Sequence, residues 1–285
     1  MKFLALIFSL MSLAAFAQTR ERNIYDLQYL PEKRVIFGTS DVSYSKYVFR
    51  RSQQNTKTET SIFSQSFGYS FTDDFSLTIS ANYLTSTSRS HFDLGTISAD
   101  TKLNFKGVSD PVIEGKYRLQ DNYFRVDLVS GLLVKSGDAE LKGDEFNNKI
   151  GGHIFNFGLD VGQKFELVQW YLEVLYLHVF ETTQVTENET TTDNAFNVYS
   201  STFAVLGFIG EHTLLKGSVR AGVSDPLGGG ARSTVQNLTV GPELQHLFTE
   251  NFLMRMGIAY ETRQITSRDG VNEGWLYTLG ATYQF

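Results

Sequence analysis

The last twelve residues of the chain, Gly274 to Phe285, alternate between apolar and polar positions. Counting back from Phe285, every second side chain is apolar or aromatic as far as Trp275, and polar residues or glycine fill most of the gaps. A side-chain period of two predicts a β-strand with one apolar and one polar face. Aromatic residues at both ends of the apolar row are typical of a strand that closes a transmembrane barrel.

This terminal strand resembles the C-terminal signature of bacterial outer-membrane barrels, which the barrel assembly machinery recognises. The resemblance implies that Phe285 and Tyr283 form an assembly signal and that this machinery is a partner. An edge strand in an ordinary soluble sandwich would show the same alternation, so this alternative stays open for the segment taken alone.

Similar alternating runs fill the chain from residue 34 onward. We predict an all-β fold, a transmembrane antiparallel up-and-down β-barrel of about twelve strands, closed by the C-terminal strand. The predicted strands are 34–49, 59–71, 75–86, 110–120, 123–135, 154–166, 169–182, 196–209, 212–224, 236–248, 251–264 and 274–285. Pro242 interrupts one run, and because proline cannot donate to a ladder we expect a bulge or a shifted boundary there.

The joints between these runs alternate between short and long. Tight turns are expected near 72–74, 120–122, 167–168, 210–211 and 249–251. Long polar loops are expected at 50–58, 87–109, 136–153, 183–195, 225–235 and 265–273. Membrane barrels differ in this way on their two sides, with short periplasmic turns and longer external loops.

Charged residues within a run share one parity. In 110–120, for example, Glu114, Lys116 and Arg118 alternate with Ile113 and Tyr117. If the apolar face contacts lipid, the charges face the lumen and avoid the cost of about 2–4 kcal/mol for Lys or Arg at the lipid-facing midplane. The predicted lumen-lining residues are Glu114, Lys116, Arg118, Arg125, Asp127, Asp160, Lys164, Glu166, Glu173, Lys216, Arg220, Glu243, Arg255, Glu261 and Arg263.

A soluble barrel would turn the apolar face inward. About twelve strands would then have to fill a wide interior with Phe, Tyr, Met and Leu, which suits barrels of about eight strands better. The transmembrane orientation is therefore favoured, and the cell outer membrane is the predicted location.

The chain divides into three predicted parts. Residues 1–17 combine a lysine, an apolar run and the small-residue cleavage pattern Ala15-Phe16-Ala17, which predicts a secretory signal peptide. Residues 18–33 lack a clean period and form a periplasmic N-terminal segment or a plug in the lumen. Residues 34–285 form the barrel.

Composition limits the partners. The chain has 23 Phe and 14 Tyr but no Cys, and its net charge of −6 argues against a general affinity for nucleic acid. Expected partners are outer-membrane lipid and lipopolysaccharide, the assembly machinery and a small-molecule solute. The five histidines are scattered and show no H-x-S or HExxH spacing. We therefore predict no catalytic residues, no metal site and no cofactor.

The segment from Gly107 to Asp138, GVSDPVIEGKYRLQDNYFRVDLVSGLLVKSGD, resembles the outer-membrane transporter family associated with the meta-pathway of phenol degradation. That family has a Gly-x-x-Asp loop, a strand ending in Lys-Tyr-Arg-Leu (here 116–119), a tight turn and a strand leading into a Gly-Asp loop. This chain has Lys135-Ser136 where the family often has a proline. The resemblance implies a barrel and a link to aromatic or hydrophobic compounds, and it supplies no catalytic residues.

The function predicted from these patterns is an outer-membrane pore for passive passage of small solutes. With Lys135 included, the inward set has a modest basic excess, from which we hypothesise a slight preference for small anions. The alternatives are uptake of aromatic or hydrophobic compounds by a plugged barrel, an outer-membrane enzyme, and a structural or adhesion barrel.

Overall fold

The computed structural model describes residues 23–51, 54–93, 98–121, 124–187, 189–224, 234–265 and 271–285. The predicted signal peptide, 1–17, lies outside the described residues. Within those ranges, no helix is long and apolar enough to cross a membrane.

The described residues form an all-β fold of seventeen strand segments. They are β1 Ile36–Arg51, β2 Gln54–Thr72, β3 Phe75–Asp93, β4 Ser98–Val108, β5 Val112–Asp121, β6 Arg125–Leu133, β7 Ala139–Lys142, β8 Glu145–Asn147, β9 Ile154–Lys164, β10 Val168–Val179, β11 Thr182–Val185, β12 Thr190–Asp193, β13 Phe196–Phe208, β14 Thr213–Ser224, β15 Val235–Thr249, β16 Phe252–Ile265 and β17 Val271–Gln284.

The long strands form a closed antiparallel barrel of twelve strands. Each pairs with its neighbours in chain order, and β17 pairs with β1 along almost its whole length, from Phe37 opposite Gln284 to Arg50 opposite Val271. Segments β4 and β5 both pair with β3 and together act as one strand of the wall. The predicted architecture, including closure by the C-terminal strand, is confirmed.

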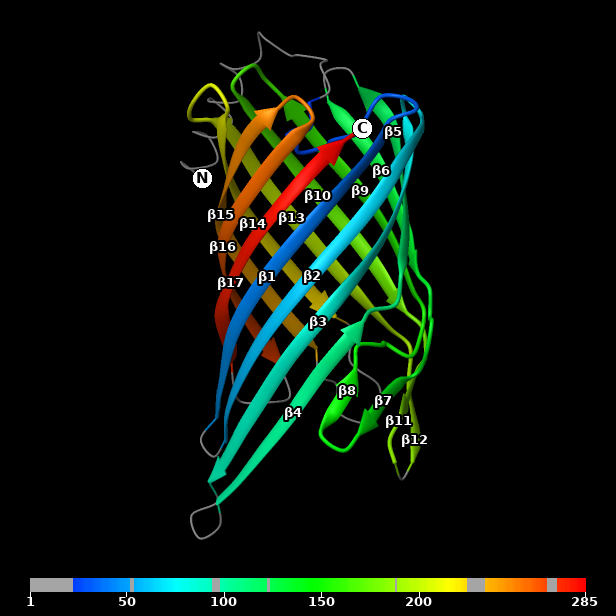
Figure 1. The fold of residues 1–285 in the computed structure, drawn as a ribbon, viewed down its shortest axis with the longest axis vertical. Coiled ribbons are helices and arrows are strands. Elements are labelled where there is room, and N and C mark those ends of the chain that lie inside the picture. The colour runs from blue at the N-terminus through cyan, green and yellow to red at the C-terminus, as the bar shows by residue number, and fades with distance from the viewer. Residues whose placement is uncertain are drawn as a thin grey trace.

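The two ends of the barrel differ (Figure 1). One end, which we call the turn end, carries the tight turns, the C-terminal Phe285 and residues 23–33. The opposite end, the hairpin end, carries the β3–β4 hairpin and the short segments β7, β8, β11 and β12.

The alternation along the strands separates two faces of the wall. On β17, the side chains of Trp275, Tyr277 and Leu279 are 47%, 46% and 51% exposed, and terminal Phe285 is 77% exposed. Apolar side chains of the other long strands are exposed in the same way, whereas the charged side chains of the opposite parity include the buried Arg118. The apolar face therefore points out of the barrel.

The prediction of long loops is wrong for two segments. Residues 50–58 and 87–109 lie largely in β1, β2, β3 and β4, which extend well beyond the rest of the wall at the hairpin end (Figure 1). Their inner face carries a ladder of hydroxyl pairs instead of apolar residues, with Thr58 Oγ1 3.1 Å from Ser88 Oγ and further pairs on either side. A search for apolar alternation overlooks such strands.

Two other predicted loops contain strands. Segments β7 and β8 pair antiparallel within 136–153, and β11 and β12 do so between Thr182 and Asp193, which overlaps the predicted loop 183–195. Parallel contacts β4–β8 and β7–β11 tie these segments to the extended wall and to one another. The predicted loop at 225–235 falls almost entirely outside the described residues.

The bulge expected at Pro242 is absent from its part of β15. The register with β16 is the same before and after Pro242, with Val240 opposite Tyr260 and Glu243 opposite Gly257. The irregularity falls instead between Leu247 and Thr249, next to the turn. Gly241 and Pro242 have no paired residue on β16, so the ladder is interrupted at the proline without a change of register.

Candidate functional site: the barrel interior

Residues 23–33, which we call the N-terminal segment, contact opposite sides of the wall. The Tyr25 ring packs against Phe208 of β13 at 5.3 Å between centroids, and Tyr29 packs against Phe37 of β1 at 6.1 Å. A segment that reaches strands so far apart around a closed wall must lie within it. Its side chains Ile24 and Leu30 are buried.

The phenol of Tyr29 also donates a hydrogen bond to Gln284 Oε1, next to the C-terminus. Burial and the nearby Asp26 carboxylate raise the pKa of Tyr29 above its ordinary value. The hydroxyl therefore remains protonated and keeps its role as donor at any pH the cell meets.

Asp26 joins the N-terminal segment to the inner charges of the wall. Its carboxylate lies 3.0 Å from Arg125 Nη1 and 3.0 Å from Lys164 Nζ, and Gln169 Nε2 donates to it at 3.1 Å. The Asp26 and Arg125 side chains are only 1% and 3% exposed. Such buried ion pairs are costly to break, because removal of one partner leaves the other charge buried without compensation.

A second layer of charges lies next to the first. Arg118 Nε donates to Asp127 Oδ1 at 2.7 Å, and Arg118 Nη2 donates to the Gln28 carbonyl at 2.6 Å. Lys116 Nζ lies 3.2 Å from Asp127 Oδ2 and 3.5 Å from Asp160 Oδ2. These contacts connect β5, β6 and β9 to each other and to the N-terminal segment.

On the other side of the interior, a cavity of about 420 Å³ is lined by β10, β13, β14, β15, β16 and β17. Lys216 Nζ lies 3.4 Å from Glu243 Oε1, and Thr202 Oγ1 donates to Glu173 Oε1 at 3.1 Å. Arg220 also lines this cavity. The lining combines charged and hydroxyl side chains with apolar ones such as Leu175 and Leu276, and the cavity has room for a small solute.

The remaining predicted residues are distributed along the wall. Arg255 Nη2 donates to Asp41 Oδ1 at 2.7 Å, and Glu261 accepts from Thr239 Oγ1 at 3.4 Å. Glu114 is half-buried on β5 and Arg263 is exposed near the hairpin end of β16. Lys135 lies just beyond β6 and pairs with Asp138 at 2.6 Å.

Glu166 does not belong to the inner face. It is exposed in the turn between β9 and β10, because β9 ends at Lys164 and the alternation stops with the strand. The sequence-based set also omitted three carboxylates that pair with its cations: Asp26, Asp41 and Asp121. Asp41 follows the parity rule of its strand. Asp121 breaks the parity of the inward charges of β5 and faces Arg125 only because the register shifts between Arg118 and Gln120. Asp26 lies where no periodicity could reveal it.

The C-terminal pair lies on the outer face of the closing strand. The Phe285 amide donates to the Ile36 carbonyl at 2.8 Å, and Tyr283 packs against Phe285 and Phe67. Closure of the wall therefore leaves the terminal ring exposed.

Solved structures share this architecture. The crystal structure of an outer membrane channel from Pseudomonas putida F1 matches with a TM-score of 0.67 at 15% identity, covering 93% of this chain and 100% of that one. The transport unit of the autotransporter AIDA-I from Escherichia coli matches with a TM-score of 0.52 at 12% identity, covering 96% and 97%. At these identities the similarity establishes the barrel fold alone. No protein-family model and no curated protein sequence matches the chain.

Proposed function

We propose that this protein is an outer-membrane channel for passive passage of small polar solutes, and that the N-terminal segment narrows its turn end. The observation that carries the proposal is the sorting of side chains across a closed wall, with apolar residues exposed outside and ion pairs inside. In water, so large an apolar surface would drive association, whereas lipid covers it at no cost.

In this orientation the turn end faces the periplasm and the hairpin end faces the outside. Of the predicted lumen-lining residues, those that line the interior cavity then border the solute path: Glu173, Lys216, Arg220 and Glu243. Others, such as Arg118 and Asp127, are buried in ion pairs. At the turn end, Asp26 and its partners restrict that path. Beside them, the cavity around Lys216 and Glu243 gives a small solute room to pass.

The hypothesis of a preference for small anions loses much of its support. Asp26, Asp41 and Asp121 neutralise cations that the sequence-based count left in excess. Arg220, exposed in the cavity, is the cation we expect to influence selectivity most.

The aromatic or hydrophobic substrates implied by the resemblance to the phenol meta-pathway family remain a second candidate. The charged side chains of Lys216, Arg220 and Glu243 on the cavity lining favour polar solutes, whereas the apolar part of the same lining leaves the second candidate open. An enzyme or an adhesion barrel has less support, because the buried charges of the interior form ion pairs that hold the wall and the N-terminal segment together. Outer-membrane lipid and the assembly machinery, acting on Tyr283 and Phe285, complete the proposed partners.

Planar-bilayer recording tests the proposal. We expect the mature chain to give small, discrete conductance steps, and a variant lacking residues 18–30 to give larger steps, because the segment no longer crosses the turn end. Liposome swelling with sugars, amino acids and aromatic acids then compares the two substrate classes. A correctly inserted barrel that conducts in neither form would refute the channel.

A further inference from the structure

Beyond the apolar band, the extended parts of β2, β3 and β4 carry a row of three cations on their outer face. Lys57 lies directly opposite Arg89, and Arg89 lies directly opposite Lys102. All three side chains are exposed, and no ion pair involving them occurs within the described ranges. We call these residues the outer basic row.

Like charges directly opposite each other destabilise a sheet, because facing side chains lie only about 4.5–5.5 Å apart at Cβ. Here the unfavourable arrangement is repeated across two successive strand pairs. A bound anion that bridges the three side chains would convert this repulsion into attraction.

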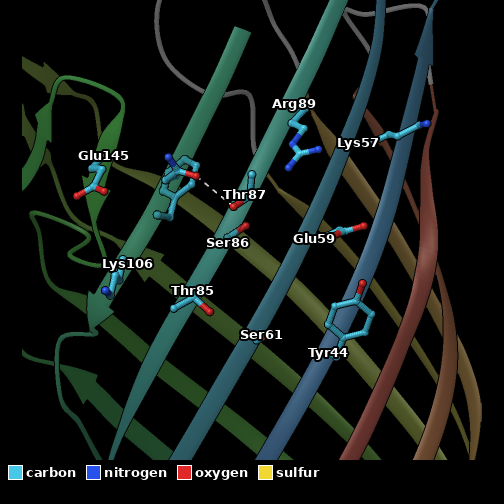
Figure 2. A pocket seen from close by; sticks show the side chains of 12 residues that line it. Tyr44, Lys57, Glu59, Ser61, Thr85, Ser86, Thr87, Arg89, Lys106 and Glu145 are labelled. Atoms are coloured by element: carbon cyan, nitrogen blue, oxygen red, sulfur yellow. Dashed lines mark hydrogen bonds between the residues drawn. The ribbon is translucent and has the colours of Figure 1, made fainter.

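The surroundings of the row supply a built surface for such an anion. Two adjoining cavities, of about 520 and 380 Å³, share Lys57 and Arg89 as lining residues. Figure 2 shows Arg89 beside β3 and, to its right, Glu59 and Lys57, with the Lys57 side chain extending away from Arg89; Lys106 and Glu145 lie on the far side. Hydroxyl and amide side chains line the space between them and offer hydrogen bonds to sugar hydroxyls.

The acidic groups near the row are mostly engaged. Glu59 pairs with Lys46 at 3.1 Å between Oε1 and Nζ, and Asp100 lies 2.8 Å from His91 Nδ1. Glu145, on β8, borders the larger cavity opposite the row. The three unpaired cations thus give this part of the outer face a positive character.

The position of the row indicates where the anion comes from. On the same outer face, the register continues from Lys57 through Glu59 and Ser61 to Phe63, which is 47% exposed in the apolar band. Lys57 therefore lies about 20 Å along the strand from Phe63 toward the hairpin end. Tyr44, 40% exposed, marks the boundary and also lines the larger cavity.

We propose that the outer basic row binds the phosphorylated headgroup of an outer-leaflet glycolipid, that is, lipopolysaccharide. The inference rests on the outer-membrane placement, in which the lipid-contacting face leads straight into the row. Charge complementarity selects phosphate, and the hydroxyl-rich cavity selects a sugar to which the phosphate is attached. The lipid is thus held against the outside of the wall, away from the solute path.

The test measures binding of bis-phosphorylated lipid A and of fully dephosphorylated lipid A to the purified barrel in detergent by native mass spectrometry. The variant replaces Lys57 and Arg89 by Gln. The matched control replaces two other exposed lysines by Gln, Lys33 at the turn end and Lys142 in β7. It removes the same amount of charge at positions away from the outer basic row. A heat-modifiability gel verifies that every variant is folded.

We expect Lys57→Gln with Arg89→Gln to weaken binding of phosphorylated lipid A by roughly 25-fold, the effect of two basic residues near an anionic surface. The control should bind like the unaltered protein, dephosphorylated lipid A should bind poorly to all, and inorganic phosphate should not compete at equal concentration. Equal binding by variant and unaltered protein, or equal binding of both lipids, would overturn the proposal. Conductance of the variant with Lys57→Gln and Arg89→Gln in planar bilayers distinguishes failure of the lipid-binding proposal from failure of the channel proposal.

Discussion

Asp26 and Arg125 are 99 residues apart in the sequence, yet Asp26 Oδ2 accepts a hydrogen bond from Arg125 Nη1 at 3.0 Å inside the barrel. Lys164 and Gln169 hold the same carboxylate. One side chain of the N-terminal segment thus connects it to β6, β9 and β10. This connection makes the position of the segment, and therefore the width of the turn end, sensitive to a single substitution.

Replacing Asp26 by Asn should loosen the N-terminal segment, because Arg125 and Lys164 lose the charge that compensates them. We expect larger single-channel conductance and faster protease cleavage within residues 23–33. Asp144→Asn, in the exposed β7–β8 turn, is the matched control and should change neither. Unchanged conductance and cleavage in Asp26→Asn would show that the ion pairs do not fix the segment.

The Arg118–Asp127 pair should be strongly coupled in stability. With side-chain exposures of 1% and 0%, loss of either partner is expected to destabilise the barrel by about 3–5 kcal/mol, since the other charge stays buried. The double variant Arg118→Met with Asp127→Leu should cost less than the two single variants added together. Urea unfolding in lipid vesicles measures each free energy. Strict additivity would argue against a direct interaction.

Arg220 should influence the selectivity of the channel. Arg220→Glu reverses a charge that is exposed in the interior cavity, so the reversal potential under a salt gradient should move toward cation preference. Lys142→Glu makes the same change of charge outside the barrel and should leave the reversal potential nearly unchanged. An equal shift of the reversal potential in both variants would show that Arg220 does not act from within the solute path.

Neighbouring positions on the closing strand should be destabilised to different extents by the same substitution. Leu279 is 51% exposed on the outer face, so Leu279→Arg should cost about 2–4 kcal/mol near the midplane of the lipid. Thr278 lines the interior cavity, where an added Arg meets water and carboxylates and should cost much less. The free energies of unfolding of the two variants are measured in vesicles and compared. A larger cost at Thr278 would contradict the assignment of the faces.

The fold was predictable because lipid outside and water inside impose opposite demands on alternate residues. Thus Leu279 and Thr278 revealed their faces in the sequence, and so did Lys116 and Arg118. The same logic failed where both faces are wet. Thr58 and Ser88 belong to strands whose outer neighbours are charged, so their alternation carried no apolar signal.

The candidate site was predictable only in part. Strand parity identified Arg125 and Lys164, but not the carboxylate that joins them, because Asp26 lies in a segment without regular structure and its contacts cross the barrel. The outer basic row was overlooked because its residues fell in segments interpreted as loops. The repeated Thr-x-Thr pattern at Thr56, Thr58 and Thr60, with its β-branched side chains, was the available signal.

The most direct test of the outward apolar face uses the two tryptophans of the chain, Trp170 and Trp275. Both follow the outer parity of their strands, and Trp275 is 47% exposed. In vesicles, lipids with brominated acyl chains should quench most of the tryptophan fluorescence, while aqueous iodide should quench little. Strong quenching by iodide with none by the brominated lipids would mean that this face meets water, and the channel proposal would fail with it.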